Sequence, residues 1–347
     1  MRVATFNLFQ FLEPPGHWYE RKPDGRSTYS DAEWTAKRGW ITDQLAALNA
    51  DIVGFQEVFS PDALRQLCAD AGYVHFATVG TPETLPEDPD VFISPLVAIA
   101  SRFPLSAQAI TVDPALAAFL PVENDFQFSR APILARVDIP DFGTISTIVA
   151  HLKSKRPVME DLTYPDATSW HDRVLDTMRR LSRGHVAALL QRGAEAAALY
   201  LTVTRILEAE RDHPVLILGD LNDDDHSIPL AALKMGDRIS EVGGVKSADW
   251  PQGTHPHFFR YRMADSWHMA ANPSGVPRTG THKHNGEWSV LDYVLVSNAF
   301  DPRNPRGRGM VVDHQVLRAH LQSDGVGDRR QSDHGQVVVE ITLRNSF

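Results

Sequence analysis

The chain has 347 residues, of which 43% are hydrophobic and 22% are charged, as in an ordinary soluble globular protein. Its formal net charge of −10 argues against a protein that binds duplex DNA non-specifically, because that binding comes mainly from neutralising phosphates. Its one cysteine, Cys68, excludes an intramolecular disulfide, and no apolar run approaches the ~20 residues that cross a bilayer.

Strand-like and helical segments alternate along the chain. Strands are expected, in chain order, at residues 2–7, 51–57, 73–79, 96–101, 133–138, 145–151, 214–219, 290–293 and 337–343. Helices are expected at residues 31–49, 61–71 and 170–212, the last with Gly184 and Gly193 as kinks or breaks, and residues 243–288 are expected to form a long loop. This alternation predicts an α/β protein in which two sheets pack face to face with helices outside.

No low-complexity linker or charge block divides the sequence. Polar residues near its two ends make chemical sense only if they meet, so we expect residues 1–347 to form one domain, and we expect a monomer. The amino terminus leads directly into a strand without the pattern of a signal peptide, which together with the single cysteine favours a cytoplasmic location.

The first two strands each end in a polar residue, Asn7 and Glu57. Period-two alternation places Glu57 on the same strand face as Val53 and Phe55, so its carboxylate should emerge where the strand leaves the core. With Asn7 and Asp333, Glu57 would offer Mg²⁺ the hard oxygen ligands that this ion prefers. The alternative is that Glu57 only caps the helix that follows.

The strand at residues 214–219 is apolar on both faces and runs into Asp220 and Asn222. A carboxylate and an amide two residues apart point the same way, so both could hold one attacking water. The next three acids are expected to be loop and cap residues before another helix: Asp223, Asp224 and Asp225.

Asp333 and His334 join a metal-seeking carboxylate to an imidazole just before the last strand. A catalytic histidine usually has a carboxylate on its far nitrogen, and Asp292, which leaves its own apolar strand, is the natural candidate.

His151 ends a further strand and precedes a cationic segment that contains Lys153 and Lys155. Such cations could neutralise the equatorial oxygens of a phosphorane. A buried structural histidine followed by a solvated turn is the alternative.

Two histidine pairs, His255 with His257 and His282 with His284, lack both the cysteines and the fixed spacing of a zinc site, so we expect none there. Walker-type loops, a nucleophile elbow and an H-E-x-x-H helix are absent from the sequence. Their absence removes the commonest NTPase, esterase and metalloprotease interpretations.

The polar residues at the strand ends occur in the order and approximate spacing of one family: Asn7, Glu57, His151, Asp220, Asn222, Asp292, Asp333 and His334. This set resembles the endonuclease/exonuclease/phosphatase superfamily, to which deoxyribonuclease I belongs, and within it a bacterial nuclease-like branch. The resemblance covers residues 3–343. It implies a four-layer α/β/β/α sandwich of two mixed sheets and hydrolysis of a phosphate ester with Mg²⁺ or Mn²⁺.

The resemblance also implies a role for each metal and water ligand. Glu57 would be the main metal ligand, helped by Asn7 and Asp333. Asp220 would orient or deprotonate the attacking water, and Asn222 would hold that water or the phosphate.

The remaining implied roles concern the phosphoryl group. His334, paired with Asp292, would act as a general acid–base or polarise the phosphoryl group, and His151 would stabilise the transition state. Arg130 would contact the substrate phosphate. Whether Asp220 or His334 is the base stays open.

A phosphodiesterase that cuts DNA or RNA, as an endonuclease or exonuclease, is the favoured function, because the cationic segment could follow a phosphate backbone. Aromatic residues expected in loops could stack on bases or pack beneath those loops: Trp18, Tyr19, Tyr164, Trp170, Trp250, Trp267 and Trp288. The alternative is a phosphatase or a phosphodiesterase of phospholipids or inositol phosphates, with a small phosphate ester as substrate. The sequence contains no basic amphipathic helix that would dock on a membrane, so we expect no stable membrane association. An inactive binding module is the remote alternative, because every expected catalytic residue is present.

Overall fold

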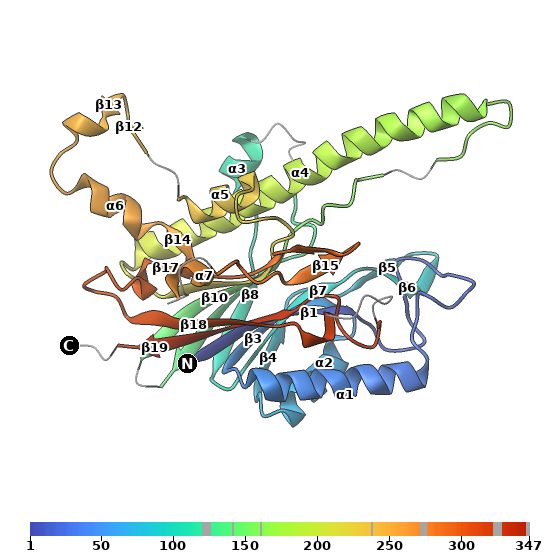
Figure 1. Cartoon of the computed structure of the whole chain (residues 1–347), viewed down its shortest axis with the longest axis horizontal. Coiled ribbons are helices and arrows are strands. Elements are labelled where there is room, and N and C mark those ends of the chain that lie inside the picture. The colour runs from blue at the N-terminus through green and yellow to red at the C-terminus, as the bar shows by residue number, and fades with distance from the viewer. Residues whose placement is uncertain are drawn as a thin grey trace.

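The computed structural model describes residues 1–119, 126–140, 142–159, 162–236, 239–270, 276–321 and 328–344. Within these residues, two mixed sheets of six strands each lie at the centre of the molecule, and helices lie on both sides of the pair (Figure 1).

The first sheet joins the two ends of the chain. Its strands, in spatial order, are β18 (Gly309–Leu317), β19 (Gln336–Leu343), β1 (Arg2–Phe11), β3 (Ile52–Val58), β7 (Leu96–Ser101) and β4 (His75–Thr78). Only β1 and β3 are parallel neighbours. The carboxyl ends of these two strands therefore meet at one edge of the sheet, and Asn7 lies opposite Gln56.

The second sheet is built in the same way from the middle of the chain. Its order is β14 (Met263–Asp265), β17 (Asp292–Ser297), β11 (Val215–Asp220), β10 (Gly143–His151), β9 (Ile133–Ile139) and β8 (Leu105–Ala109). Only β10 and β11 are parallel neighbours. Because both faces of β11 are covered, all six of its residues are buried.

The molecule has four layers, two of helices and two of sheets, and apolar side chains fill the three spaces between them. Val3 and Ile52 of the first sheet pack against Leu218 and Val294 of the second. The outer face of the first sheet packs on α1 (Asp31–Leu48) and α2 (Pro61–Asp70), and that of the second on α4 (Trp170–Ala209) and α5 (Ile228–Lys234). The predicted α/β/β/α sandwich is confirmed.

Smaller elements surround this sandwich. A three-stranded sheet contains β2 (His17–Trp18), β6 (Asp88–Ser94) and β5 (Glu83–Leu85), and two hairpins pair β12 (Glu241–Val242) with β13 (Val245–Lys246) and β15 (His282–His284) with β16 (Glu287–Ser289). Short helices are α3 (Pro114–Phe119), α6 (Thr254–Arg260) and α7 (Ser266–Met269), with 3-10 turns at Ser247–Asp249, Asn298–Phe300 and Ala319–Leu321. The described part of residues 243–288 is thus a series of short elements, and the expectation of one long loop is wrong.

Helix α4 runs without a break, although Gly184 and Gly193 were expected to interrupt it. The reason for glycine at position 184 is the approach of another segment, because a Cβ there would lie 2.3 Å from the carbonyl oxygen of Val158. Arg192 of α4 is buried, and its Nε donates to Asp223 at 2.8 Å.

The first half of α4 extends beyond the sheets (Figure 1). It exposes Trp170, Val174 and Met178 beside Arg179 and Arg183. This basic, apolar surface was not predicted, because the exposed residues continue the same helical stripe that is buried further along α4. None of the helices in the described part of the chain has the length and apolar composition that crossing a bilayer requires.

Candidate active site

The register of the second sheet brings three predicted residues side by side. His151 of β10 lies opposite Asp220 of β11, which in turn lies opposite Asp292 of β17. Asp292 was expected at the end of its strand, but it begins β17. Because β17 is antiparallel to β11, the start of β17 and the end of β11 share one edge of the sheet.

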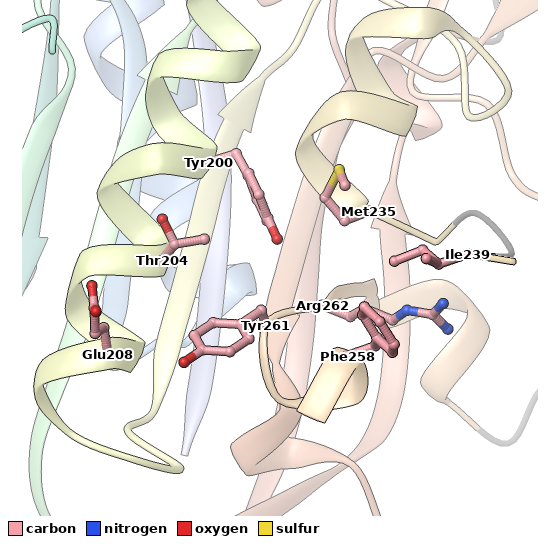
Figure 2. Close-up of a pocket in the computed structure, with 8 residues that line it drawn as sticks. All are labelled: Tyr200, Thr204, Glu208, Met235, Ile239, Phe258, Tyr261 and Arg262. Carbon is pink, nitrogen blue, oxygen red and sulfur yellow. The ribbon is translucent and has the colours of Figure 1, made fainter. Parts of the chain in front are cut away.

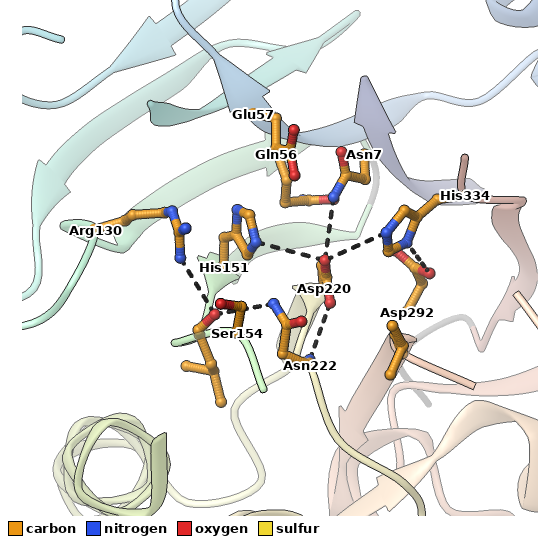
Figure 3. Close-up of polar contacts among 12 residues, drawn as sticks. Asn7, Gln56, Glu57, Arg130, His151, Ser154, Asp220, Asn222, Asp292 and His334 are labelled. Carbon is orange, nitrogen blue, oxygen red and sulfur yellow. Dashed lines mark hydrogen bonds and ion pairs between the residues drawn. The ribbon is translucent and has the colours of Figure 1, made fainter. Parts of the chain in front are cut away.

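Asp220 is the centre of the polar cluster at this edge (Figure 3). Its Oδ2 accepts a hydrogen bond from Asn7 Nδ2 at 3.1 Å and lies 3.5 Å from His151 Nε2 and 3.8 Å from His334 Nε2. Its Oδ1 accepts from the backbone N–H of Asn222 at 2.9 Å. Only 1% of Asp220 is exposed, so both sheets converge on one buried carboxylate.

A chain of hydrogen bonds fixes His334. Its Nδ1 bonds to Asp292 Oδ2 at 2.8 Å, and its backbone N–H donates to Ser332 Oγ at 2.9 Å. The Ser332 hydroxyl donates to the carbonyl of Asn7, and Thr281 Oγ1 accepts from the backbone N–H of Asp292 at 3.2 Å. The imidazole and its carboxylate are therefore held in position by two further hydroxyl groups.

Burial and neighbouring charges change the pKa values at this edge. Burial raises the pKa of Asp220 to about 7, and the Asp292 carboxylate adds to the rise although His334 opposes it. Burial alone would lower the pKa of His334, but Asp292 and Asp220 hold it well above its usual range. Burial, Arg130 and His334 lower the pKa of His151 well below its usual range. These shifts favour the charged form of His334 and the neutral form of His151.

Glu57 reaches the site through an irregular strand end. Its φ of 60° lies in the left-handed region, and the pairing of β3 with β7 shifts between Phe55 and Val58. As a result Val53, Phe55 and Val58 share the helix-side core. The simple alternation that put Glu57 on that face is wrong, because the bulge inserts one residue and turns its carboxylate toward the backbone N–H of Gln10, 2.9 Å away.

A pocket of about 780 Å³ lies at this edge. Predicted residues that line it are Glu57, Arg130, His151, Lys155, Asp220, Asn222, Asp333 and His334. Asn7 and Asp292 lie behind this wall, where they contact Asp220 and His334.

Of the three predicted phosphate ligands, Arg130 and Lys155 line the pocket and Lys153 does not. Lys153 does not line the pocket, and its Nζ lies 3.3 Å from Ser154 Oγ. Lys155 Nζ forms an ion pair with Asp224 at 2.7 Å, and Arg130 Nη1 donates to the carbonyl of Leu152 at 3.3 Å. Arg130 and Lys155 thus face the pocket with part of their charge already engaged.

The pocket also contains residues that were not predicted for the site: Arg156, His185, His282 and His284. Of the seven loop aromatics, Tyr19 and Trp288 line it, whereas Trp18 is part of the core. His282 stands beside His334 with ring centroids 4.8 Å apart, and burial and His334 lower its pKa to about 4. The sequence could have indicated His282 only through its position next to Thr281 and ten residues before Asp292. The β15–β16 hairpin is what brings it to the site.

A second pocket, of about 350 Å³, lies between α4, α5 and α6 (Figure 2). Its lining is Tyr200, Thr204, Glu208, Met235, Ile239, Phe258, Tyr261 and Arg262. It contains none of the predicted site residues, and its mixture of tyrosine hydroxyls and apolar side chains has no cluster of acids and histidines.

The donor set at the sheet edge fits a divalent metal ion. In the described residues, no lysine or arginine forms an ion pair with Glu57, Asp220, Asp292 or Asp333. The buried Oδ1 atoms of Asp292 and Asp333 also have no hydrogen-bond partner within the described part of the chain. Carboxylates buried in this way are costly unless something compensates, and a divalent cation would do so.

The sequence matches the profile of the Endonuclease/Exonuclease/phosphatase family over residues 4–334, and the chain belongs to that family. Its members are hydrolases that act on phosphoester bonds and generally depend on a divalent metal. The expected family is thereby confirmed, together with the general class of reaction.

Solved structures with the same fold include three distant ones. The catalytic domain of human nocturnin with bound sulfate is 15% identical at a TM-score of 0.57, with 99% of this chain and 94% of that chain covered. ANGEL2, a 2′,3′-cyclic phosphatase in complex with adenosine-2′,3′-vanadate, is 15% identical at a TM-score of 0.56 (99% and 95% covered). An endonuclease/exonuclease/phosphatase from Beutenbergia cavernae is 18% identical at a TM-score of 0.52 (99% and 71% covered). No curated protein sequence matches the chain.

Proposed function

We propose that this protein is a divalent-metal-dependent phosphodiesterase that cuts nucleic acid by attack of a water molecule held beside Asp220. One observation carries the proposal. Asp220 is a buried carboxylate at a pocket wall, contacted by Asn7, His151 and His334, and no lysine or arginine in the described residues pairs with it.

Glu57 and Asp333 would hold the metal, because both line the pocket and neither pairs with a described lysine or arginine. Asn7 would assist through its Oδ1, which accepts one hydrogen bond from the backbone N–H of Phe9 and keeps a second lone pair. When bound, Mg²⁺ or Mn²⁺ would polarise a phosphoryl oxygen and lower the pKa of a water molecule.

The charges favour Asp220 as the proton acceptor. Asp292 and Asp220 raise the pKa of His334 and so favour its protonated form, which donates a proton and does not accept one. Burial raises the pKa of Asp220 to about 7, which makes this carboxylate the better acceptor. Asp220 therefore accepts the proton of the attacking water, and His334 offers its Nε2–H to the phosphoryl group or to the leaving oxygen.

His151 and Asn222 support this reaction. Burial favours the neutral imidazole of His151, which lines the pocket with its Nε2 3.5 Å from Asp220 Oδ2, so a proton on Nε2 could be donated to a phosphoryl oxygen there. Asn222 fixes the second oxygen of Asp220 through its backbone, while its side-chain Nδ2 donates to the carbonyl of Leu152 at 3.0 Å. The side-chain amide of Asn222 is therefore held in place by this bond, and its second N–H and its Oδ1 stay available to bind substrate.

The pocket rim supports nucleic acid as the substrate. Arg130, Lys155 and Arg156 could contact backbone phosphates, and Tyr19 and Trp288 could stack on bases. The ANGEL2 structure with a bound adenosine analogue is a fold relative that holds a nucleotide.

The test is hydrolysis by the purified protein with Mn²⁺ or Mg²⁺, and with EDTA as control. Single-stranded DNA, duplex DNA and RNA would be run beside bis-p-nitrophenyl phosphate and p-nitrophenyl phosphate. We expect cleavage of nucleic acid and of the diester, and no cleavage with EDTA or in Asp220→Asn.

Other outcomes separate the alternatives. Hydrolysis of the monoester alone would make the protein a phosphatase. Failure with all of these substrates, followed by hydrolysis of a phospholipid or an inositol phosphate, would move it to that branch. Metal binding without any hydrolysis would indicate a binding module.

A further inference from the structure

His282 is fixed against the segment that carries Asp333 and His334. An isolated antiparallel bridge pairs His282 with His334. The backbone N–H of Gly335 donates to the carbonyl of Thr281 at 2.6 Å, and that of Thr281 donates to Ser289 at 2.8 Å. The β15–β16 hairpin and the Asp333 segment therefore form one continuous frame.

The ligand atoms in this frame are close together. One ligand atom from each of His282, Asp333 and His334 lies within 4.8 Å of the others. The Oδ1 of Asp333 is buried and has no hydrogen-bond partner among the described residues. Ser289 Oγ lies 3.5 Å from Nδ1 of His282, which leaves its Nε2 for the pocket that this side chain lines.

In the proposed function, the Nε2 of His334 serves the phosphoryl group beside Asp220, 3.8 Å away, so we assign the imidazole ligand of this group to His282. His282 has no such carboxylate partner among the described residues, where the hydrogen-bond partner of its ring is the Ser289 hydroxyl. The frame therefore pairs one free imidazole nitrogen with one free carboxylate oxygen.

We propose that His282 supplies an imidazole nitrogen to a metal ion held by Asp333, and that it makes the site select a first-row transition ion over Mg²⁺. Mg²⁺ prefers an all-oxygen shell, whereas an imidazole raises affinity along the series from Mn²⁺ to Zn²⁺. The inference rests on the proposed function for the position of the metal beside Asp333 and for the role of His334.

The decisive variant is His282→Phe, which removes the nitrogen donor and keeps a ring against His334. His284→Phe is the matched control, because His284 is on the same hairpin and lines the same pocket but is outside the three-residue cluster. His282→Asn is a second variant, and thermal melting would check that all of them fold.

The experiment measures Mn²⁺ binding by electron paramagnetic resonance, with Mg²⁺ as competitor and without substrate. We expect modulation of the Mn²⁺ signal by an imidazole nitrogen in the wild-type protein, and its loss in His282→Phe. We also expect His282→Phe to weaken Mn²⁺ binding by at least ~10-fold while Mg²⁺ binding changes little. The His284→Phe protein should match the wild type in both respects.

Three results would overturn the proposal: no nitrogen modulation in the wild-type protein, modulation that persists in His282→Phe, or equal weakening of Mn²⁺ and Mg²⁺. If a separate hydrolysis assay of His282→Phe showed a higher KM while Mn²⁺ binding stayed unchanged, His282 would be a substrate contact instead. Because no substrate is present, a protein that binds Mn²⁺ through His282 but hydrolyses nothing would contradict the proposed function and leave this inference standing.

Discussion

Two clusters of the same residue types contain acids only five residues apart along the chain, Asp220 and Asp225. Asp220, Asp292 and His334 form one, and Asp225, Asp265 and His268 form the other, each with ligand atoms within 4.8 Å of one another. Counting acids and histidines alone would make both of them metal sites or catalytic sites.

The second cluster already contains its own cations. Lys234 Nζ lies 2.5 Å from Asp225, and Arg278 Nη1 lies 2.5 Å from Asp265 and 3.8 Å from Asp225. Burial alone would raise the pKa of Asp225, but hydrogen bonds from Lys234 and His268 hold it at about 2. Asp220 has no described lysine or arginine partner, and burial raises its pKa to about 7.

The comparison shows that compensation, more than composition, distinguishes a reactive site from a structural one. A lysine or arginine that completes an acidic cluster lowers its energy and removes its capacity for a metal or a proton. The Asp220 cluster has no lysine or arginine partner among the described residues, so a metal ion or a substrate can balance its negative charge. Exchanging single carboxylates in the two clusters tests this interpretation.

The largest effect should come from Asp220→Asn. We expect kcat for bis-p-nitrophenyl phosphate to fall by at least ~10³-fold, because the amide cannot accept the proton of the attacking water. Asp225→Asn is the matched change five residues later, and its kcat should stay within about 3-fold of the wild type, since Asp225 does not line the catalytic pocket. Similar losses of activity in both variants at equal folding would remove the distinction between the clusters.

Asp292→Asn should have the next largest effect. Without the carboxylate, the pKa of His334 falls and its Nδ1–H loses its partner, so we expect kcat to drop by roughly 10²- to 10⁴-fold. Nuclear magnetic resonance titration of His334 gives a direct check, because its apparent pKa should be lower in the variant. A variant with an unchanged His334 titration would show that Asp220 alone holds the charge.

The pH dependence of the wild-type protein should report Asp220. The base acts only when deprotonated, so kcat/KM should rise with pH toward a plateau and fall about tenfold per unit on the acid side. The midpoint should lie at or below 7, because burial raises the pKa to about 7 and a nearby metal would favour the carboxylate. Asp225→Asn should show the same profile, whereas a flat profile between pH 5 and 8 would exclude Asp220 as the base.

The sequence predicted the four-layer fold because apolar periodicity and strand–helix alternation are local properties that the packing preserves. The strand ends that carry Asn7, Glu57, His151 and Asp220 do meet, since both sheets place parallel strand pairs at one edge. The orientation of Glu57 could not be predicted in the same way, because a bulge changes the count of residues along β3.

Other features of the site depend on contacts between distant segments. His282 joins the pocket only because a hairpin forms in a stretch that composition marks as a loop. Lys153 does not line the pocket but places its Nζ 3.3 Å from Ser154 Oγ, a choice of rotamer that residue type does not encode. Whether an acid is compensated, as Asp225 is by Lys234 and Arg278, also becomes visible only in three dimensions.

The smallest effect should be the loss of stability in Asp225→Asn. At pH 7 we expect the free energy of unfolding to fall by about 1–3 kcal/mol, because Lys234 and His268 lose a charged acceptor. The folded-state pKa of about 2 lies below the ordinary value of 3.8, so this contribution is complete above pH ~4 and is lost as pH falls toward 2. Denaturant unfolding at pH 7 and pH 2.5 should therefore show a gap between wild type and variant that shrinks in acid. A gap that stayed constant would mean that the cluster is held by packing and not by the charge of Asp225, and the comparison with Asp220 would then lose its electrostatic basis.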